Sequence, residues 1–150
     1  MALLVLALAG AGCGGAASGE RPPASAVTAT PAAALVFPRQ AALPGPPSYP
    51  TARLDGTLVV AERCLRILAT ESGTSYLPIW HADFTLGSDQ GVVAIRDARG
   101  QVLWRVGDSV HIGGGEMPAD AAAWAAIPAL RQPPPAECPG PYWLVGEVSN

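Results

Sequence analysis

Two histidines and two carboxylates are the side chains of this chain that come nearest to a metal-ligand set. His81 and Asp83 lie two residues apart, and Glu116 follows His111 by five residues. Two imidazoles and a carboxylate could hold zinc and leave one coordination position open for chemistry. Neither spacing is a metal signature, and the sequence gives no reason for the two segments to meet. We therefore predict no metal site and no cofactor, and we keep an enzyme or metal-binding protein that uses these four residues as an alternative.

Nucleophilic catalysis has even less support. No Gly-x-Ser-x-Gly elbow is present, and the candidate serines lie in turn-like sequence: Ser72, Ser75, Ser88 and Ser109. Cys64 has only Arg63 and Arg66 as cationic neighbours and follows no helix start, so it is better explained as half of a disulfide than as a thiolate nucleophile. We expect the protein not to be an enzyme.

A glycine run and several aromatic residues are the remaining candidates for a ligand site. The three glycines of residues 113–115 could expose amide donors to an anion, although a flexible turn is the commoner explanation. Trp80 and Trp143 stand beside loop-forming residues, so we expect them to be the exposed aromatics that would contact a sugar or peptide. The candidate ligand-binding residues are Trp80, His81, His111, Gly113, Gly114, Gly115, Glu116 and Trp143.

The N-terminal residues resemble a bacterial lipoprotein signal. An apolar run of eight residues, Ala2 to Ala9, precedes Ala11, Gly12 and Cys13, and it is too short for a membrane-spanning helix. The resemblance implies that residues 1–12 are removed and that the Cys13 thiol takes up a diacylglyceryl group.

The alternative is an ordinary secretory signal cleaved near Ala16 or Ala17. Under either interpretation the chain is exported from the cytoplasm. We expect an extracytoplasmic protein, lipid-anchored to a bacterial membrane, and to the outer one if the source has two membranes, because Gly14 rather than Asp follows the cysteine.

Residues 13–50 read as the lipidated cysteine followed by a disordered linker. Eight prolines interrupt sequence rich in Ala, Ser and Thr between Gly14 and Pro50, and large apolar side chains are too few to offset the entropy of ordering. Leu35, Val36 and Phe37 form one apolar group that could dock on the domain or a partner, although we favour its being part of the linker. A formal charge of −3 argues against nucleic acid as a partner.

Residues 51–150 read as one small, mainly β domain. Short runs of β-branched and aromatic residues alternate with turn sequence, and they predict strands at 56–61, 64–69, 75–80, 91–97, 102–106, 109–112 and 142–148. Gly73, Gly100 and Gly107 fit tight turns between these strands, which predicts that consecutive strands are antiparallel neighbours.

Strand alternation predicts which side chains face the core. Val102, Trp104 and Val106 share one side of their strand, and Val110 and Ile112 lie opposite His111. Residues 118–127 predict a short helix before the last strand, with Trp124 and Ile127 packed on the sheet. We predict a small antiparallel Greek-key barrel, OB-like, with a small sandwich as the alternative.

Cys64 and Cys138 are the remaining cysteines once Cys13 is assigned to the lipid. In an oxidising compartment they predict a disulfide, which would close a loop of 74 residues; two buried free thiols are the alternative.

Two stretches, from Gly100 to Glu116 and from Cys138 to Gly146, resemble uncharacterised exported bacterial proteins and lipoproteins over roughly residues 55–150. The resemblance implies a compact β domain outside the cytoplasm and no established activity. We expect a monomeric binding or interaction domain of the cell envelope whose partner is a protein, a glycan or a small ligand. The alternatives are the enzyme or metal-binding protein described above, acting in the envelope, and a structural envelope component.

Overall fold

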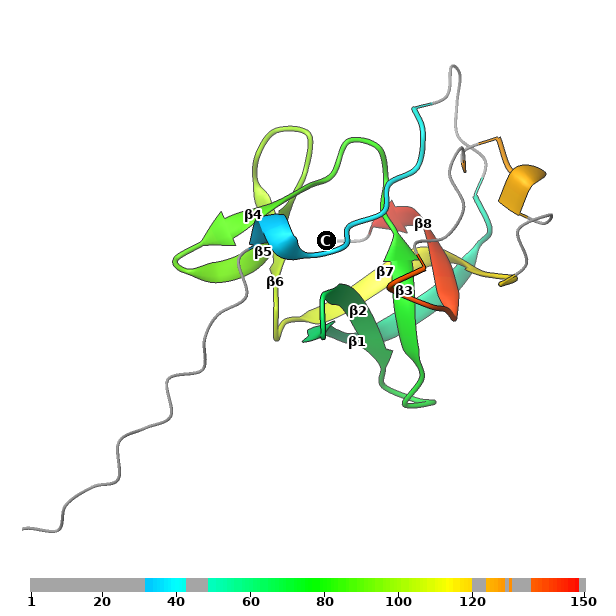
Figure 1. The fold of residues 1–150 in the computed structure, drawn as a ribbon, viewed down its shortest axis with the longest axis horizontal. Coiled ribbons are helices and arrows are strands. Elements are labelled where there is room, and N and C mark those ends of the chain that lie inside the picture. Colours follow the sequence, from blue (N-terminus) through cyan, green and yellow to red (C-terminus); the bar gives the residue numbers. More distant parts are fainter. Residues whose placement is uncertain (1–31, 43–48, 120–123, 129, 131–135, 149–150) are drawn as a thin grey trace, which may run out of the picture.

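The computed structural model describes residues 32–42, 49–119, 124–128, 130 and 136–148 (Figure 1). They form one short 3-10 helix and eight strands: η1 (Ala32–Ala34), β1 (Ala52–Ala61), β2 (Cys64–Ala69), β3 (Ser75–Ile79), β4 (Thr85–Asp89), β5 (Val92–Arg96), β6 (Val102–Arg105), β7 (Ser109–Met117) and β8 (Tyr142–Val148). The prediction of a mainly β protein is confirmed. No helix among the described residues is long and apolar enough to cross a membrane.

The strands form two sheets. In the five-stranded sheet, hydrogen bonding runs in the order β1-β2-β3-β8-β7 and returns from β7 to β1. The three-stranded sheet has the order β4-β5-β6 and lies at one end of the first sheet (Figure 1). All pairings are antiparallel except that of β3 with β8. Consecutive strands are therefore not always neighbours, because the chain leaves the five-stranded sheet after β3 and re-enters it at β7.

All seven predicted strands occur, although β1 begins at Ala52 rather than at residue 56, one further strand is present and one is longer than predicted. β4 was not predicted, because its sequence of Thr, Leu, Gly, Ser and Asp contains only one large apolar residue, Leu86. β7 continues beyond Ile112 to Met117, so the flexible turn expected at residues 113–115 is wrong: the glycines are part of a strand. The register shifts between Ile112 and Gly114, and Gly114 has a φ of 144°, which a glycine adopts without strain.

The predicted turns are confirmed. Gly73, Gly100 and Gly107 have φ values of 66°, 78° and 99°, and they stand at the β2–β3, β5–β6 and β6–β7 connections. Residues with a Cβ are disfavoured in this region of backbone space, so glycine suits each of these turns.

The helix expected at residues 118–127 is not found among the described residues. Residues 120–123 lie outside them, and only Trp124 and Ala125 have α-helical backbone. The predicted packing of this segment is nevertheless present, since Trp124 is buried and Ile127 packs against the same group of apolar side chains.

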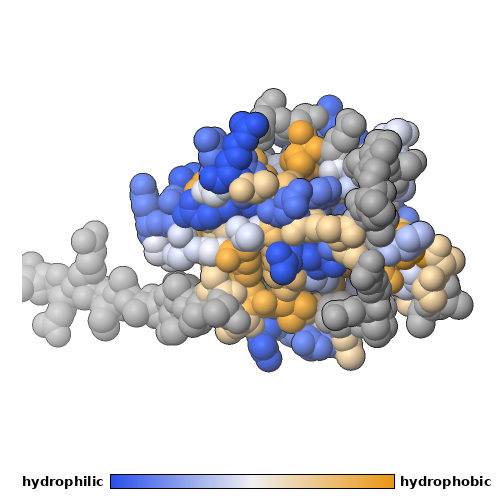
Figure 2. All heavy atoms as spheres, turned by 90° about the horizontal axis from the view of Figure 1, so that it is seen from above, coloured by the Kyte–Doolittle hydropathy of each residue, from blue (hydrophilic) through white to orange (hydrophobic). Residues whose placement is uncertain are grey.

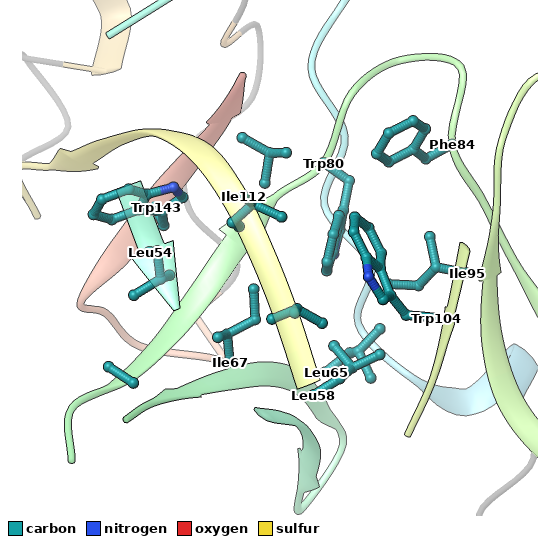
Figure 3. Close-up of a cluster of buried hydrophobic side chains, with 13 residues drawn as sticks. Leu54, Leu58, Leu65, Ile67, Trp80, Phe84, Ile95, Trp104, Ile112 and Trp143 are labelled. Atoms are coloured by element: carbon teal, nitrogen blue, oxygen red, sulfur yellow. The ribbon is translucent and has the colours of Figure 1, made fainter. Parts of the chain in front are cut away.

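The inner cluster consists of apolar side chains from one face of the five-stranded sheet, and it extends to side chains of the three-stranded sheet. Figure 3 shows Trp80, Phe84, Ile95 and Trp104 gathered at one end and Trp143 at the other. Its members are Leu54, Leu58, Leu65, Ile67, Ala69, Trp80, Phe84, Ile95, Trp104, Val110, Ile112, Trp143 and Val145. The predicted inward placement of Trp104, Val110 and Ile112 is confirmed, and Val106 packs against the cluster, whereas the half-buried Val102 does not belong to it. Both sheets contribute side chains to this one core, and these contacts hold the two sheets against each other.

The outer cluster lies on the opposite face of β3 and β8. It consists of Cys64, Leu77, Ile79, Met117, Trp124, Leu130, Cys138, Tyr142 and Leu144. The Sγ atoms of Cys64 and Cys138 are 2.01 Å apart, which confirms the predicted disulfide. The guanidinium of Arg66 donates to the carbonyls of Ser75 and Pro139, so the chain before β8 is held to β2 and β3 by polar contacts as well.

Residues 32–42, which we name the strap, pack against the domain, although they fall within the predicted linker. Val36 N–H donates to the carbonyl of Arg63 at 2.7 Å, and Gln40 N–H donates to that of Trp80 at 2.8 Å. Phe37 stacks on the Trp80 ring with centroids 5.6 Å apart. The apolar group around Phe37 therefore docks on the domain, and the packed part of the chain begins before residue 51. The other residues of the predicted linker, apart from Tyr49 and Pro50, lie outside the described ones.

Candidate functional site

One group of exposed polar side chains crosses from β1 to β7. Asp55 and His111 are cross-strand partners, and the Asp55 carboxylate lies 2.5 Å from His111 Nδ1. Arg53 Nε donates to the same carboxylate oxygen at 2.8 Å. Because a carboxylate can only accept, His111 Nδ1 is the donor in this contact. The side chain of Arg53 is 68% exposed, that of Asp55 is 38% exposed and that of His111 is 55% exposed.

Two hydrogen bonds lower the pKa of Asp55, the central residue of this group. The bond from His111 and then the bond from Arg53 hold the pKa of the Asp55 carboxyl below its ordinary value of 3.8. Asp55 therefore remains a carboxylate under ordinary conditions and fixes the orientation of both neighbours. The result is an ordered guanidinium and imidazole on the surface.

The neighbouring residues on the same side of the sheet extend this group into a face. Alternation places Arg53, Asp55 and Thr57 outward on β1, and Thr57 pairs with Ser109 of β7 on one side and Leu68 of β2 on the other. We name the set Arg53, Asp55, Thr57, Leu68, Ser109 and His111 the β1–β7 face. Leu68 is 42% exposed, so the face combines charged, hydroxyl and apolar side chains.

His81 belongs to a second, separate imidazole–carboxylate pair in the β3–β4 connection. Its Nδ1 is 3.5 Å from Asp83 Oδ2, and the Tyr49 and Phe84 rings lie 6.1 and 5.9 Å from its own. Burial, and then the charge of Asp83, raise the pKa of the Tyr49 phenol. This pair is looser than that of Asp55 and His111.

Glu116 has different neighbours again. Tyr76 Oη donates to its carboxylate at 3.4 Å, and the Tyr76 ring meets that of Trp143 edge to face at 5.6 Å. Burial, and then the Glu116 charge, raise the pKa of the Tyr76 phenol. His81, His111 and Glu116 thus contact three different sets of side chains, and no group of three possible metal ligands occurs in the part of the chain that the structure describes.

The tryptophans and glycines are not an exposed ligand platform. Trp80 and Trp143 are only 0% and 5% exposed, so the expectation that they are the exposed aromatics is wrong. Both lie in strands or at their ends, where alternation turns large rings into the core. A Cβ built on Gly114 would stand 2.0 Å from the carbonyl oxygen of Leu144, so the glycine run allows close approach of β8 rather than of a ligand.

A polar network covers part of the three-stranded sheet. Asp89 of β4 accepts from Arg105 Nε of β6 at 2.8 Å and lies 3.5 Å from Arg96 Nη2 of β5. Figure 2 shows hydrophilic residues concentrated over the end formed by this sheet. Since the one carboxylate links all three strands, we assign the network a structural role.

Sequence reasoning missed Arg53 and Asp55. The predicted strand began at residue 56, whereas β1 begins at Ala52, so the alternation of Arg53, Asp55 and Thr57 was not seen as one outward face. The pairing of Asp55 with His111 depends on the β1–β7 register, which no local pattern specifies.

Cys13 lies outside the described residues, so its lipidation stays a prediction. No protein-family model, curated protein or solved structure matches the chain.

Proposed function

We propose that the protein is an extracytoplasmic domain, tethered to a bacterial membrane by a lipid on Cys13, that binds a partner without catalysing a reaction. The observation that carries the location is the buried disulfide of Cys64 and Cys138, whose residues are 3% and 0% exposed. Disulfides persist in oxidising compartments and are rare in the cytosol. Together with the signal-like residues that end at Cys13, the disulfide favours export.

We also propose that the five-stranded sheet is an OB-like Greek-key barrel. In favour of this, its strand order places the first three strands side by side, pairs the third with the last in parallel and returns to the first through the fourth. The three-stranded sheet is then an insertion between the third and fourth barrel strands.

OB-folds commonly bind ligands on the face of their second and third strands. In this chain the outer cluster occupies much of that region, because Leu77 and Ile79 of β3 pack against Trp124 and Cys138. The β1–β7 face is exposed instead, and it supports binding at a different place on the same kind of scaffold.

The geometry gives the enzyme or metal-binding alternative no comparable support. That alternative needs His81, Asp83, His111 and Glu116 to act together, whereas His81 lies beside Asp83 and His111 beside Asp55. A binding role requires only an ordered and accessible surface.

Fractionation of the native host tests the proposal. We expect the protein in the membrane fraction, labelled by a palmitate analogue, and we expect Cys13→Ser to abolish both the label and the membrane association. Ser18→Ala is the matched control and should leave both unchanged. Proximity labelling from the anchored protein should then identify a reproducible partner, and finding no consistent neighbour would count against a binding role.

A further inference from the structure

The strap is the first described part of the chain that a load on the lipid anchor of the proposed function would reach. Cys13 is the residue assigned to the lipid, the strap begins at Ala32, and β1 begins at Ala52. Since the chain is continuous, a pull on Cys13 passes through the strap before it reaches any of the eight strands. The strap begins beside the three-stranded sheet, where η1 contacts β4.

The backbone of the strap is attached by separate contacts rather than by a continuous ladder. Its two isolated bridges pair Val36 with Cys64 and Arg39 with Trp80. β1, by contrast, forms ladders with both β7 and β2. Detachment of the strap therefore breaks none of the hydrogen bonds that join strands within either sheet.

Three side chains provide the main contacts of the strap. Leu35 is buried, Phe37 stacks on the Trp80 ring, and the Gln40 amide donates to two carbonyls where the inner and outer clusters meet. These contacts define one docked position, yet they are few compared with those of a strand inside a sheet. Segments held by few contacts open locally at a lower free energy than that of unfolding the whole domain.

The part of the chain that follows the strap has its own attachment at Tyr49. The Tyr49 ring meets that of His81 edge to face at 6.1 Å, and a Cβ built on Gly146 would stand 2.8 Å from Tyr49 Cβ. Neither contact involves the strap. Tyr49 therefore marks where the chain stays on the domain when the strap leaves it.

We propose that the strap is a reserve of tether length, which detaches under load while the β domain stays folded. With the strap docked, the 18 residues 14–31 separate Cys13 from the domain, and with it detached the 35 residues 14–48 do so. At about 3.1 Å per residue for a proline-rich chain, the stretched tether lengthens from roughly 56 Å to roughly 110 Å. A partner could thus be bound over a wider range of distances from the membrane. This deepens the proposed function and rests on it for the anchor.

Native-state hydrogen exchange of the natural full chain in detergent tests the proposal. The amides of Val36 and Gln40 donate to carbonyls of the domain, and the Trp80 amide donates to Pro38 of the strap, so all three are protected only while the strap is docked. We expect these three amides to share one exchange rate, about a hundredfold or more above that of the slowest amides of β1, β2 and β7. Exchange as slow as in these strands, or no protection at all, would overturn the proposal.

A variant distant from the strap separates the two openings. Leu54 lies beside Trp143, at the end of the inner cluster opposite Trp80 (Figure 3). Leu54→Ala should accelerate exchange of the slowest sheet amides by about tenfold or more and leave the strap amides unchanged. Val92→Ala, at an exposed apolar residue, is the matched control and should change neither set. Equal acceleration of both sets by Leu54→Ala would show that the strap opens only when the domain unfolds.

Single-molecule stretching tests the response to load. The handles are attached through Ser18→Cys and through an extension of Asn150, with the disulfide of Cys64 and Cys138 intact. We expect a first lengthening of at most about 60 Å before the domain unfolds, because residues 32–48 are released first. Phe37→Ala should lower the force of this first step alone. A single step in which the strap and the strands extend together would contradict the proposal.

Neither measurement depends on the lipid. A strap that opens separately in a protein that proves unacylated would refute the anchor alone. A strap that opens only with the sheets in an acylated protein would refute the reserve of tether length alone.

Discussion

The inner and outer clusters are both apolar and both buried, yet they are assembled in different ways. The inner cluster is built mainly from side chains that alternate along neighbouring strands, such as Val110 and Ile112 of β7. The outer cluster joins one face of β3 and β8 to chain that precedes β8, and it contains the disulfide of Cys64 and Cys138. The first is specified by a local pattern, whereas the second needs a covalent link between residues 74 positions apart.

Gln40 of the strap stabilises the region where the two clusters meet. Its side-chain amide donates to the carbonyls of Ile79 at 3.0 Å and Val145 at 2.6 Å. Ile79 belongs to the outer cluster and Val145 to the inner one. The strap therefore couples the two clusters, and variants can separate their contributions.

The largest effect is expected for the inner cluster. Trp80→Ala should lower the free energy of unfolding by about 3–5 kcal/mol, because it removes a fully buried indole and leaves a cavity among Phe37, Phe84 and Trp104. Urea denaturation measures the change. Val92→Ala, at an exposed apolar residue, is the control, and an equal loss in the two variants would contradict this assignment of the core.

The disulfide should have the next largest effect. Replacing both cysteines, Cys64→Ser with Cys138→Ser, should cost about 2–4 kcal/mol, since the unfolded chain regains the freedom of a long loop. The fluorescence of Trp124 and the rates of hydrogen exchange in β8 should respond more than hydrogen exchange in β1. If hydrogen exchange accelerated equally in β8 and β1, the disulfide would stabilise both clusters alike. That result would contradict the proposed difference between the inner and the outer cluster.

A smaller effect is expected for the strap. Gln40→Ala leaves two buried carbonyls without their donor and should destabilise the protein by about 1–3 kcal/mol. Gln101→Ala is the control, because Gln101 is exposed and bonds Asp97 through its backbone, which the substitution keeps. Unchanged stability of Gln40→Ala would show that the strap is dispensable.

The smallest effect is expected outside both clusters, at Asp55. Its pKa is lower in the folded state, so its contribution is complete above the unfolded value near 3.8 and is lost as the pH falls through the folded value. Asp55→Asn should therefore be slightly less stable than the natural chain at pH 7, and the difference should shrink as the pH falls below 3.8, as measured by urea midpoints. Glu71→Gln is an exposed control, and a difference that grows toward low pH would have the wrong sign.

Features that depend only on residues close together in the sequence were predicted correctly. Turn glycines such as Gly73 and alternating apolar residues such as Val110 and Ile112 were placed correctly, because a backbone dihedral and a strand face need no distant partner. The cysteine pair was predicted from compartment chemistry rather than from geometry. β4 was missed because Leu86 is its one large apolar residue, and its pairing with β5 is not visible in so short a pattern.

The candidate site was harder to predict because it depends on register. His111 was singled out, but its partner Asp55 is 56 residues away and meets it only through the β1–β7 pairing. Trp80 and Trp143 were expected at the surface because loop-forming residues follow or precede them. Phe37 of the strap, Phe84 and Trp104 pack on Trp80, and Trp143 is buried in the inner cluster. Proline content also concealed the strap, whose apolar residues pack on the domain.

An intact-mass measurement of the protein purified from its native host tests the central claim most directly. The account predicts a chain that begins at Cys13, carries the mass of a diacylglyceryl group, and loses the equivalent of two hydrogens to the disulfide of Cys64 and Cys138. A chain that retains Met1, without lipid and with both thiols free, would contradict it.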